Sequence, residues 1–386
     1  MVVRTNSRDP NEGMVENAII MAGGSGKRLW PASLDNKPKQ FLRVNGKTSL
    51  FQETLKLAFH LEMPGRVYVV TRQSHVEAVI RECQTLSVDA RSRLAVLAEP
   101  IARNTAPALA LAASRMLLDE RSEQSCLVMA ADHIISTLDA FSNSVSIASV
   151  EAEKGFIVLY GIVPLTPATG YGYIEIAAPS SGVGAFRPSR LELSETNFSQ
   201  SYEVEAFHEK PDVKTAREYL SSGRHFWNAG IFTYRNDVLL RELDLHAGAV
   251  SKLFKQPSEK WFKKWNSGGI VIYEPAEELK SLYALCPNIS IDYAVMEKTE
   301  RSRMLRANFE WSDVGSWDVI AELNPPPKAL VYSHQSSNNF VYSELPVALC
   351  GVENLIVTVA NNRVLICKKG MSQLVKDAAL EDSKKE

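Results

Sequence analysis

A glycine-rich turn near the N-terminus carries the residue types best suited to chemistry. Residues 18–42 read AIIMAGGSGKRLWPASLDNKPKQFL, in which an apolar run leads directly into Gly23-Gly24-Ser25-Gly26. Glycines at three of these positions allow the backbone to approach a ligand closely and to present bare N–H groups. Four cations follow in the same segment, at Lys27, Arg28, Lys37 and Lys39. Fixed donors and positive charges after a strand predict a polyanion site, and phosphate is the anion we expect there.

Two familiar phosphate-binding motifs do not fit this turn. A Walker P-loop needs Gly-x4-Gly-Lys-Ser/Thr, but Met21 stands where its first glycine belongs and Arg28 where its hydroxyl belongs. The dinucleotide fingerprint Gly-x-Gly-x-x-Gly starts at Gly24 but meets Leu29 at its third glycine. The other alternative is a strand and turn with surface lysines, which the density of cations disfavours.

An aspartate at the end of a later apolar run could bind a metal ion. Residues 126–131 are apolar and are followed by Asp132. A carboxylate close to phosphates is unfavourable unless a cation lies between them, and Mg²⁺ accepts carboxylate, water and phosphate oxygens together. Asp132 could instead cap a helix, because aspartate is common at helix N-termini.

Between these two segments lies a loop that has two interpretations. Residues 99–108 read EPIARNTAPA, and Asn104 or Thr105 can cap the alanine-rich helix that follows. The same loop could instead recognise a base. Guanine presents N–H donors and an O6 acceptor, which suit a loop of carbonyls, amide groups and an asparagine side chain.

The elements that must position these residues alternate between strands and helices. Apolar runs typical of strands occur at 18–22, 67–71, 93–97 and 125–130, and helical spacing occurs at 49–60, 75–83 and 106–119. This alternation predicts a Rossmann-like α/β half with a parallel sheet covered on both faces. In such a sheet the ligand binds beyond the carboxyl ends of the strands, where both the glycine turn and Asp132 would lie.

The second half of the chain has a different pattern. Strands are predicted at 155–162, 169–175 and 206–212, which suggests a mixed-sheet extension, with an exposed loop over 179–201. We expect an amphipathic surface helix within 243–266, although its lysines and aromatics could also suggest RNA or membrane contact. Another helix should begin at 290–298 with Asp292 as its cap. Short β-prone runs at 339–342, 347–349, 355–359 and 364–367 predict a small C-terminal β domain.

Composition narrows the class of protein. The 386 residues are 45% hydrophobic and 23% charged, which fits a soluble chain of about two domains, and the net charge of −2 disfavours nucleic acid as a partner. No run approaches the ~18 apolar residues of a membrane span, so we expect no membrane partner and a cytoplasmic location. The five cysteines form no Cys-x-x-Cys pair and the seven histidines show no ligand spacing, so neither predicts a zinc site.

The glycine turn as a whole resembles the signature of the sugar-1-phosphate nucleotidyltransferases. Its residues 29–31 and 38–41 resemble the mannose-1-phosphate guanylyltransferase branch, as do the segments 99–108, 131–133, 209–210, 226–232 and 311–317. The resemblance implies a nucleotide site at Ala22, Gly23, Gly24, Ser25, Gly26, Lys27, Glu99, Arg103, Asn104 and Thr105, with Arg28 and Lys39 catalytic. It implies a sugar-phosphate site at Tyr171, Gly172, Glu209, Lys210, Asn228, Gly230 and Asp292, and a Mg²⁺ site at Asp132 and Asp313.

The implied fold is a GT-A-like, Rossmann-like mixed sheet followed by a compact left-handed β-helix-like domain. We expect a disordered tail over 1–16, a nucleotidyltransferase catalytic domain over 17–324 and the small C-terminal β-helical domain over 328–386. The chain departs from the family pattern at Leu34, Ala102, Ala229, Asn361 and Leu374. No cupin-like isomerase domain follows the β domain, so we expect no phosphomannose isomerase activity.

The implied reaction is the transfer of GMP from GTP to α-D-mannose 1-phosphate, giving GDP-mannose and pyrophosphate with the help of Mg²⁺. The substrates would then be the partners, and a homodimer is compatible with the sequence. Two alternatives stay open: transfer with glucose 1-phosphate or UTP, and a catalytically silent nucleotide-sugar-binding regulatory subunit. The intact set of Arg28, Lys39, Asp132 and Asp313 argues against the silent alternative.

Overall fold

The computed structural model describes residues 14–24, 26–44, 46–119, 122–177, 200–323, 325 and 329–382. Ser25 and the side chain of Lys27 lie outside this description. So do most of the tail predicted at 1–16 and of the loop predicted at 179–201.

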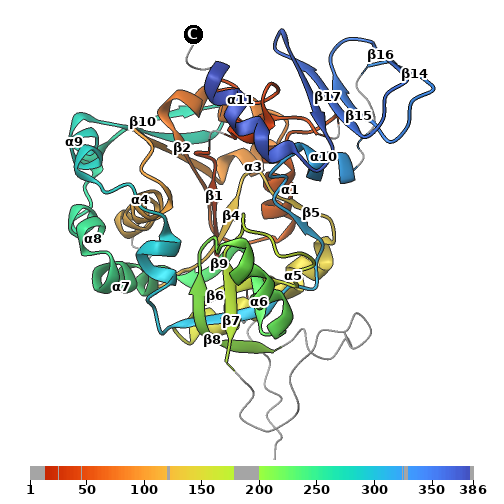
Figure 1. Ribbon diagram of the computed structural model, residues 1–386. Coiled ribbons are helices and arrows are strands. Elements are labelled where there is room, and N and C mark those ends of the chain that lie inside the picture. Colours follow the sequence, from red (N-terminus) through yellow and green to blue (C-terminus); the bar gives the residue numbers. More distant parts are fainter. Residues whose placement is uncertain are drawn as a thin grey trace, which may run out of the picture.

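An eleven-stranded mixed sheet runs through the molecule in the order β10-β11-β3-β2-β1-β4-β9-β6-β12-β8-β7 (Figure 1). Its strands are β1 (Asn17–Met21), β2 (Val67–Arg72), β3 (Leu94–Glu99), β4 (Ser125–Ala130), β6 (Ile157–Ile162), β7 (Tyr173–Ile176), β8 (Ser201–His208), β9 (His225–Arg235), β10 (Phe262–Ser267), β11 (Ile270–Pro275) and β12 (Ser302–Arg306). A small antiparallel pair is formed by β5 (Ile134–Ile135) and β13 (Trp311–Ser312).

The helices are α1 (Leu50–His60), α2 (Val76–Cys83), α3 (Val88–Ser92), α4 (Thr105–Leu118), α5 (Leu138–Glu153), α6 (Val213–Ser222), α7 (Asn236–His246), α8 (Gly248–Phe254), α9 (Glu277–Leu285), α10 (Trp317–Leu323) and α11 (Val375–Asp382). Short helical turns are η1 (Lys27–Leu29), η2 (Lys39–Phe41), η3 (Gln73–His75), η5 (Glu259–Trp261), η6 (Asp292–Met296) and η7 (Ser372–Leu374). Among the described helices, none has the length and apolar character needed to cross a lipid bilayer.

The predicted parallel half is confirmed. Strand β1 lies between β2 and β4 and is parallel to both, so that Ile19 pairs with Tyr68 on one side and with Val128 on the other. Strand β3 extends this group beyond β2, again in parallel. Beyond β4 the sheet becomes mixed, because β9 pairs antiparallel with β4, β6 and β7. The carboxyl ends of β1 and β4 therefore meet at one edge of the sheet.

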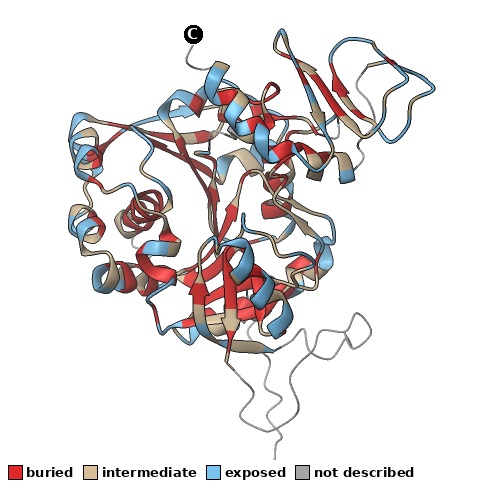
Figure 2. Ribbon diagram, viewed as in Figure 1, coloured by how far each residue is buried: buried red, intermediate tan, exposed pale blue. Residues whose placement is uncertain are grey.

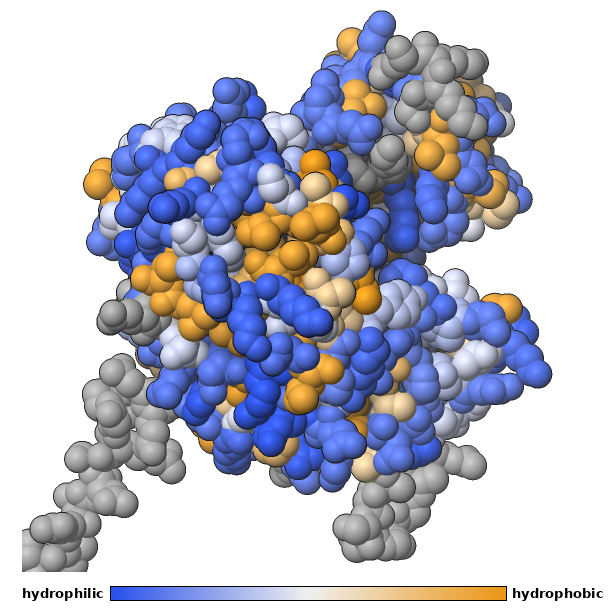
Figure 3. Space-filling view, turned by 90° about the vertical axis from the view of Figure 1, so that its left-hand side faces the viewer, coloured by the Kyte–Doolittle hydropathy of each residue, from blue (hydrophilic) through white to orange (hydrophobic). Residues whose placement is uncertain are grey.

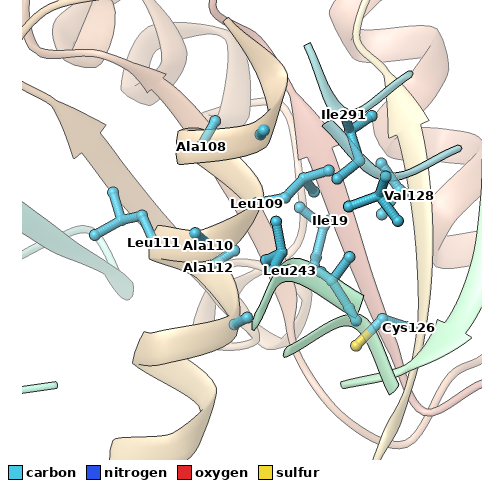
Figure 4. Packing of buried hydrophobic residues seen from close by; sticks show 14 of the residues in the cluster. Ile19, Ala108, Leu109, Ala110, Leu111, Ala112, Cys126, Val128, Leu243 and Ile291 are labelled. Carbon is cyan, nitrogen blue, oxygen red and sulfur yellow. The ribbon is translucent and has the colours of Figure 1, made fainter. Parts of the chain in front are cut away.

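Hydrophobic cores cover both faces of the sheet. One core joins α4, α7 and α8 to the sheet, and the other joins α1, α2 and α5 to the opposite face. Figure 2 shows the central strands buried and the outer surfaces of the helices exposed. In Figure 4, Leu109 of α4 points toward Ile19 of β1 and Val128 of β4, and small alanines let the helix backbone lie close to the strands. Burial of this face positions the N-terminus of α4 beside the glycine turn.

Two predicted helices differ from the structure. Residues 243–266 do not form one surface helix: α7 ends at His246, α8 ends at Phe254, and residues 262–267 form the edge strand β10. The lysines of β10 are exposed, whereas Trp261 and Phe262 are buried in the core. Asp292 is not a cap but the first residue of the π-type turn η6, whose N-cap position is Ile291.

The C-terminal strands pack against the glycine-turn segment. They are β14 (Val331–His334), β15 (Phe340–Ser343), β16 (Val347–Cys350), β17 (Leu355–Ala360) and β18 (Arg363–Lys368). Strands β14 and β16 pair in parallel, and so do β15 and β17. A third core contains Leu29 and Ala32 of the N-terminal segment together with Trp317, Tyr342 and Ile356. The C-terminal strands thus hold residues 27–39, here called the cation-rich loop, in position.

The surface facing the viewer in Figure 3 is mostly hydrophilic, with hydrophobic side chains gathered near its middle. The large exposed apolar side chains of the described residues include Leu245, Trp265 and Leu285. These three come from the α7 to α9 region, which Figure 1 places on the side that Figure 3 shows.

Candidate active site

The glycine turn is held in place by buried hydrogen bonds at the end of β1. The carbonyl of Ala22 accepts from Gln40 Nε2 at 2.8 Å and from Thr71 Oγ1 at 3.0 Å. Gly26 has φ of +64°, and a Cβ at this position would overlap the Cβ of Lys39. Only glycine therefore fits here, and its absent side chain lets the backbone of the turn contact the lysine.

A cavity of about 400 Å³ lies beyond the carboxyl ends of β1, β3 and β4. Its lining includes Gly23 and Gly24 from the turn, Glu99 and Asn104 from the following loop, and Asp132. Six of the residues predicted to bind a nucleotide meet here, although they come from distant parts of the sequence: Gly23, Gly24, Glu99, Arg103, Asn104 and Thr105. Gly26 lines the second cavity described below, and Ala22 is buried and lines neither. Arg72 and Asn288 also line this cavity and carried no signal in the sequence, whereas Gln40, another lining residue, belongs to the family-like segment 38–41.

Glu99 is a buried carboxyl group on the wall of this cavity. Its side chain accepts a hydrogen bond from Tyr283 Oη at 3.3 Å, and it is 4% exposed. Burial raises the pKa of Glu99 to about 8, because the hydroxyl of Tyr283 and the charge of Arg72 only partly offset the loss of water. The Glu99 Oε2 atom lies beside the Gly23 backbone, so a substrate in the cavity can reach it.

The side chains of the Arg103–Thr105 loop hold the loop itself. Asn104 is the N-cap of α4, and its Oδ1 accepts from the Thr105 amide at 2.9 Å. Thr105 Oγ1 accepts from the Ile291 amide, and Arg103 donates to the carbonyl of Tyr283. The capping interpretation is therefore confirmed for Asn104. All three residues also line the cavity, so capping and ligand contact are compatible.

A second cavity, of about 410 Å³, lies next to the first and shares Asp132 with it. Its lining combines the cations Arg28, Lys39 and Lys376 with the carboxylates of Asp132 and Asp313. Gly26, His133 and Gly315 complete the lining. Arg28 forms no ion pair with a described residue. The sequence did not single out Lys376, which lies on α11 and reaches this cavity because α11 contacts η1.

Lys39 lies between the two predicted metal ligands. Its Nζ is 3.0 Å from Asp132 Oδ2 and donates to the backbone carbonyl of Asp313 at 2.5 Å. Burial alone would raise the pKa of Asp132, but the Lys39 ammonium and the nearby His133 lower it below its ordinary value. Asp132 is therefore a carboxylate at neutral pH.

The Asp313 carboxylate is oriented by two donors on one oxygen. Its Oδ1 accepts from Tyr171 Oη at 3.1 Å and from the Gly315 amide at 3.0 Å. Its Oδ2 accepts no hydrogen bond from a described residue. Two carboxylates on one cavity wall, one with a free oxygen, form the hard oxygen donor set that Mg²⁺ prefers. The residues present therefore fit a magnesium ion.

His133 is a hydrogen-bonding neighbour of this site. Its Nδ1 accepts from Trp311 Nε1 at 3.2 Å, and the two rings meet edge to face. These contacts make His133 a packing and hydrogen-bonding partner of Trp311. Gly230, which was predicted to contact the sugar, has φ of +66° and lies against the His133 ring.

The predicted sugar residues come from the segment before β7, the segment after β8, the first half of β9 and the turn η6. Asn228 Nδ2 lies 3.5 Å from Asp292 Oδ1, and a Cβ at Gly172 would lie 2.6 Å from Glu209 Oε2. Lys210 pairs with Glu209 and has φ of +49°. Burial, together with the charge of Glu209, raises the pKa of Asp292 to about 6. Tyr171 links this group to Asp313 through its hydroxyl.

Comparisons with known proteins agree with this geometry. The model of the family described as nucleotidyl transferase matches residues 17–326. The chain is 36% identical to a mannose-1-phosphate guanylyltransferase of Escherichia coli over 93% of its own length and 72% of the relative. It is 35% identical to the protein of the same name from Klebsiella pneumoniae, with the same coverage.

A solved structure shares the whole fold. The crystal structure described as mannose-1-phosphate geranyltransferase from Thermus thermophilus superposes with a TM-score of 0.77 at 29% identity, covering 96% of this chain and 100% of that one. The sequence identities, the family model and the superposed fold all indicate the same family. The chain therefore belongs to the nucleotidyl transferase family, in the branch of the mannose-1-phosphate guanylyltransferases.

Proposed function

We propose that this protein transfers GMP from GTP to α-D-mannose 1-phosphate, giving GDP-mannose and pyrophosphate. The observation that carries the proposal is the meeting of two cavities at Asp132, one beside the glycine turn and Glu99, the other lined by Arg28, Lys39 and Asp313. A nucleoside triphosphate needs such a continuous site, with a recess for the base and cations for the phosphates. The names of the relatives support this choice of reaction.

The nucleotide would bind with its base in the first cavity. Guanine presents N–H donors that other bases lack at the same edge, and Glu99 offers a carboxyl oxygen in the wall of that cavity. The backbone of Ala22, Gly23, Gly24 and Gly26 would face the phosphates, and we assign Ser25 and Lys27 to the same role. The loop of Arg103, Asn104 and Thr105 would contact the base, and the hydrogen bonds of its side chains hold its backbone in place for this role.

The sugar phosphate would bind where Tyr171, Gly172, Glu209, Lys210, Asn228, Gly230 and Asp292 gather. Carboxylates accept hydrogen bonds from sugar hydroxyls, and the Lys210 ammonium suits the phosphate of the sugar. A side chain at position 172 would collide with the Glu209 carboxylate, so the glycine keeps this space open. The Tyr171 hydroxyl donates to Asp313, and this contact would link the sugar site to the proposed metal site.

The chemistry would be an in-line displacement. A phosphate oxygen of mannose 1-phosphate attacks the α-phosphorus of GTP, the bond from that phosphorus to the bridging oxygen breaks, and pyrophosphate leaves. The nucleophile is already an anion, so catalysis reduces to positioning and charge neutralisation. Lys39 would draw the two anionic groups together at the α-phosphate, and Arg28 would steady the β- and γ-phosphates.

Asp132 and Asp313 would hold a divalent cation, which we assign as Mg²⁺. Such an ion neutralises charge on phosphate oxygens when it is bound. Lys39 now occupies one oxygen of Asp132, so substrate binding must draw its ammonium toward the phosphates.

We infer a finer architecture as well. A GT-A-like catalytic domain would span 17–324 and a left-handed β-helix-like domain 328–386, which the parallel pairing of β14 with β16 and of β15 with β17 supports. We further propose that the protein acts in the cytoplasm, without nucleic acid or membrane partners, and that it can form a homodimer.

A matrix of substrates tests the proposal. Pyrophosphate release is measured for four nucleoside triphosphates against mannose 1-phosphate and glucose 1-phosphate, with Mg²⁺. We expect the highest kcat/KM for GTP with mannose 1-phosphate. A preference for UTP or glucose 1-phosphate would support the related transferase instead, and no release in any combination would support the silent regulatory subunit.

A further inference from the structure

Three side chains that the proposed reaction does not use converge on one face of the β7–β8–β9 sheet. They are Glu175 on β7, His208 at the end of β8 and His225 at the start of β9. Glu175 Oε2 lies 3.6 Å from the Nε2 of each histidine. One ligand atom from each of the three side chains lies within 4.8 Å of the other two. Helix α6 lies beside these strands in Figure 1.

The hydrogen bonds around His225 define which of its nitrogens is free. The Ser222 Oγ atom lies 2.8 Å from the carbonyl oxygen of Tyr219, to which the hydroxyl can donate, and 2.6 Å from His225 Nδ1. We assign the proton of the neutral ring to Nδ1, because the Ser222 hydroxyl is already engaged with Tyr219, and this assignment leaves a lone pair on Nε2. This Nε2 is buried, has no hydrogen-bond partner among the described residues, and belongs to a side chain that is 6% exposed.

A lone pair that faces a carboxylate oxygen is an unfavourable arrangement unless a cation lies between them. Two acceptors, Nε2 of His225 and Oε2 of Glu175, face each other at a distance too long for a hydrogen bond. With the proton on Nδ1, a cation that accepts a lone pair from each group would satisfy both of them. The Nε2 of His208 lies at the same distance from Oε2 and can supply the third ligand.

We propose that Glu175, His208 and His225 bind a divalent transition-metal ion, with Zn²⁺ as the best match. Two imidazole nitrogens and one carboxylate oxygen are a ligand set that zinc accepts, with water in the fourth position. Ligands about 2.1 Å from a tetrahedral zinc lie about 3.4 Å from one another. The two separations between the carboxylate oxygen and an imidazole nitrogen are 3.6 Å, and all three ligand atoms lie within 4.8 Å of one another. The ion would fit with small shifts of side chains.

The surroundings hold these ligands in the required orientation. Arg224 Nη2 donates to Glu175 Oε1 at 2.5 Å, which leaves Oε2 for the metal. The Tyr219 ring stacks on His225 at a centroid distance of 4.0 Å and on His208 at 5.0 Å. Hydrogen bonds and packing to ligating groups are typical of metal sites, where they fix the orientation of the rings.

This site is separate from the proposed magnesium site and differs from it in chemistry. Magnesium prefers oxygen ligands, whereas imidazole suits zinc and similar metals. The zinc would link the strands β7, β8 and β9. Two residues assigned to the sugar follow its ligands in the sequence: Glu209 directly after His208, and Asn228 three positions after His225. The proposed role is therefore structural: the ion fixes the strand ends that carry those residues.

Titration of the full chain with Zn²⁺ or Co²⁺ in excess Mg²⁺ tests the site. Isothermal titration calorimetry should give one tight Zn²⁺ site per chain, and Co²⁺ should give the intense visible absorption of a tetrahedral ion with nitrogen ligands. His208→Gln, a change at a half-buried position, should weaken Zn²⁺ binding by more than about 100-fold. Glu175→Gln should weaken it as well. The exposed His60, which lies outside the cluster, provides the matched control His60→Gln.

The outcomes are distinct. Loss of the tight site in His208→Gln and Glu175→Gln, with His60→Gln unchanged, supports the proposal, provided that circular dichroism shows both variants folded. Absence of tight Zn²⁺ binding in the unmodified chain overturns it, and so does an unchanged site in both variants. The unmodified chain should also gain thermal stability on adding Zn²⁺. If a variant fails to fold, the Co²⁺ spectrum of the unmodified chain decides alone, because a spectrum without nitrogen ligands contradicts the assignment.

Discussion

The Lys39 ammonium lies 3.0 Å from Asp132 Oδ2 and donates at 2.5 Å to the backbone carbonyl of Asp313. The Lys39 ammonium thus contacts both residues proposed to hold the metal. Asp132 follows the end of β4, and Asp313 lies in the segment before α10. Before substrate binds, the Lys39 ammonium neutralises the half-buried Asp132 carboxylate. When phosphates enter, the same ammonium can turn to them, so the lysine serves the site in both states.

Lys39→Ala should lower kcat by about two orders of magnitude or more, because it removes a charge that acts on the transition state. Steady-state pyrophosphate release with GTP and mannose 1-phosphate measures the effect. Lys56→Ala is the matched control, since Lys56 is exposed on α1 and pairs with Glu53. A rate for Lys39→Ala close to that of Lys56→Ala would remove Lys39 from the catalytic machinery.

Glu99→Gln should stabilise the protein at high pH more than at low pH. The pKa of Glu99 is raised from its ordinary 4.5 to about 8. Below pH 4.5 both folded and unfolded states hold the proton. As the pH rises toward 8, only the unfolded state releases it, so the unmodified chain loses stability by at most about 1.4 kcal/mol per pH unit. Urea unfolding at pH 5 and pH 8 measures the difference. A gap between variant and unmodified chain that is equal at the two pH values would contradict the pKa shift.

The parallel half of the sheet was predictable because its signals are local. Alternating apolar strands and helices over 18–130 predict a βαβ arrangement, and this arrangement brings Asp132 to the same sheet edge as the glycine turn. The error at 243–266 arose because lysines and aromatics at helical spacing also fit a short helix followed by an edge strand. Gly268-Gly269, both with positive φ, marks the hairpin turn between β10 and β11 and could have revealed the strand.

Other residues of the two cavities and of the proposed zinc site could not be predicted, because tertiary contacts alone bring them together. Lys376 reaches the phosphate side from a helix at the far end of the chain. Glu175, His208 and His225 show no ligand spacing in sequence, because adjacent strands of a sheet, not one helix, bring them together. The departure at Asn361 acquires a meaning only when its contacts with residues 31–37 are known.

Asn361→Ala should loosen the cation-rich loop. Asn361 Nδ2 donates to the carbonyls of Pro31 and Ala32, and its Oδ1 accepts from Lys37. Losing these contacts should cost about 1–2 kcal/mol of stability and raise KM for GTP. Asn338→Ala is a close control, because Asn338 has φ of +52° beside +49° for Asn361, so both variants place alanine in the left-handed region. Asn338 contacts Asn354 and Lys369 instead of the loop. Equal KM values for the two variants would mean that the tail does not support the substrate site.

Asp292→Asn should raise the thermal stability of the protein at pH 8 and weaken its binding of mannose 1-phosphate. The pKa of Asp292 is raised to about 6 by burial and by the Glu209 carboxylate, so above pH 6 the folded chain holds two like charges close together. The stability contributed by protonated Asp292 is fully present below its ordinary pKa of 3.8 and is lost as the pH rises through 6. The neutral asparagine keeps the shape without that repulsion, so Tm at pH 8 should rise. If Asp292 accepts a hydrogen bond from a sugar hydroxyl, KM for mannose 1-phosphate should increase by about tenfold or more, while the Kd of GTP stays the same. A lower Tm would show that Asp292 is stabilised by partners rather than strained, and an unchanged KM would remove it from the sugar site.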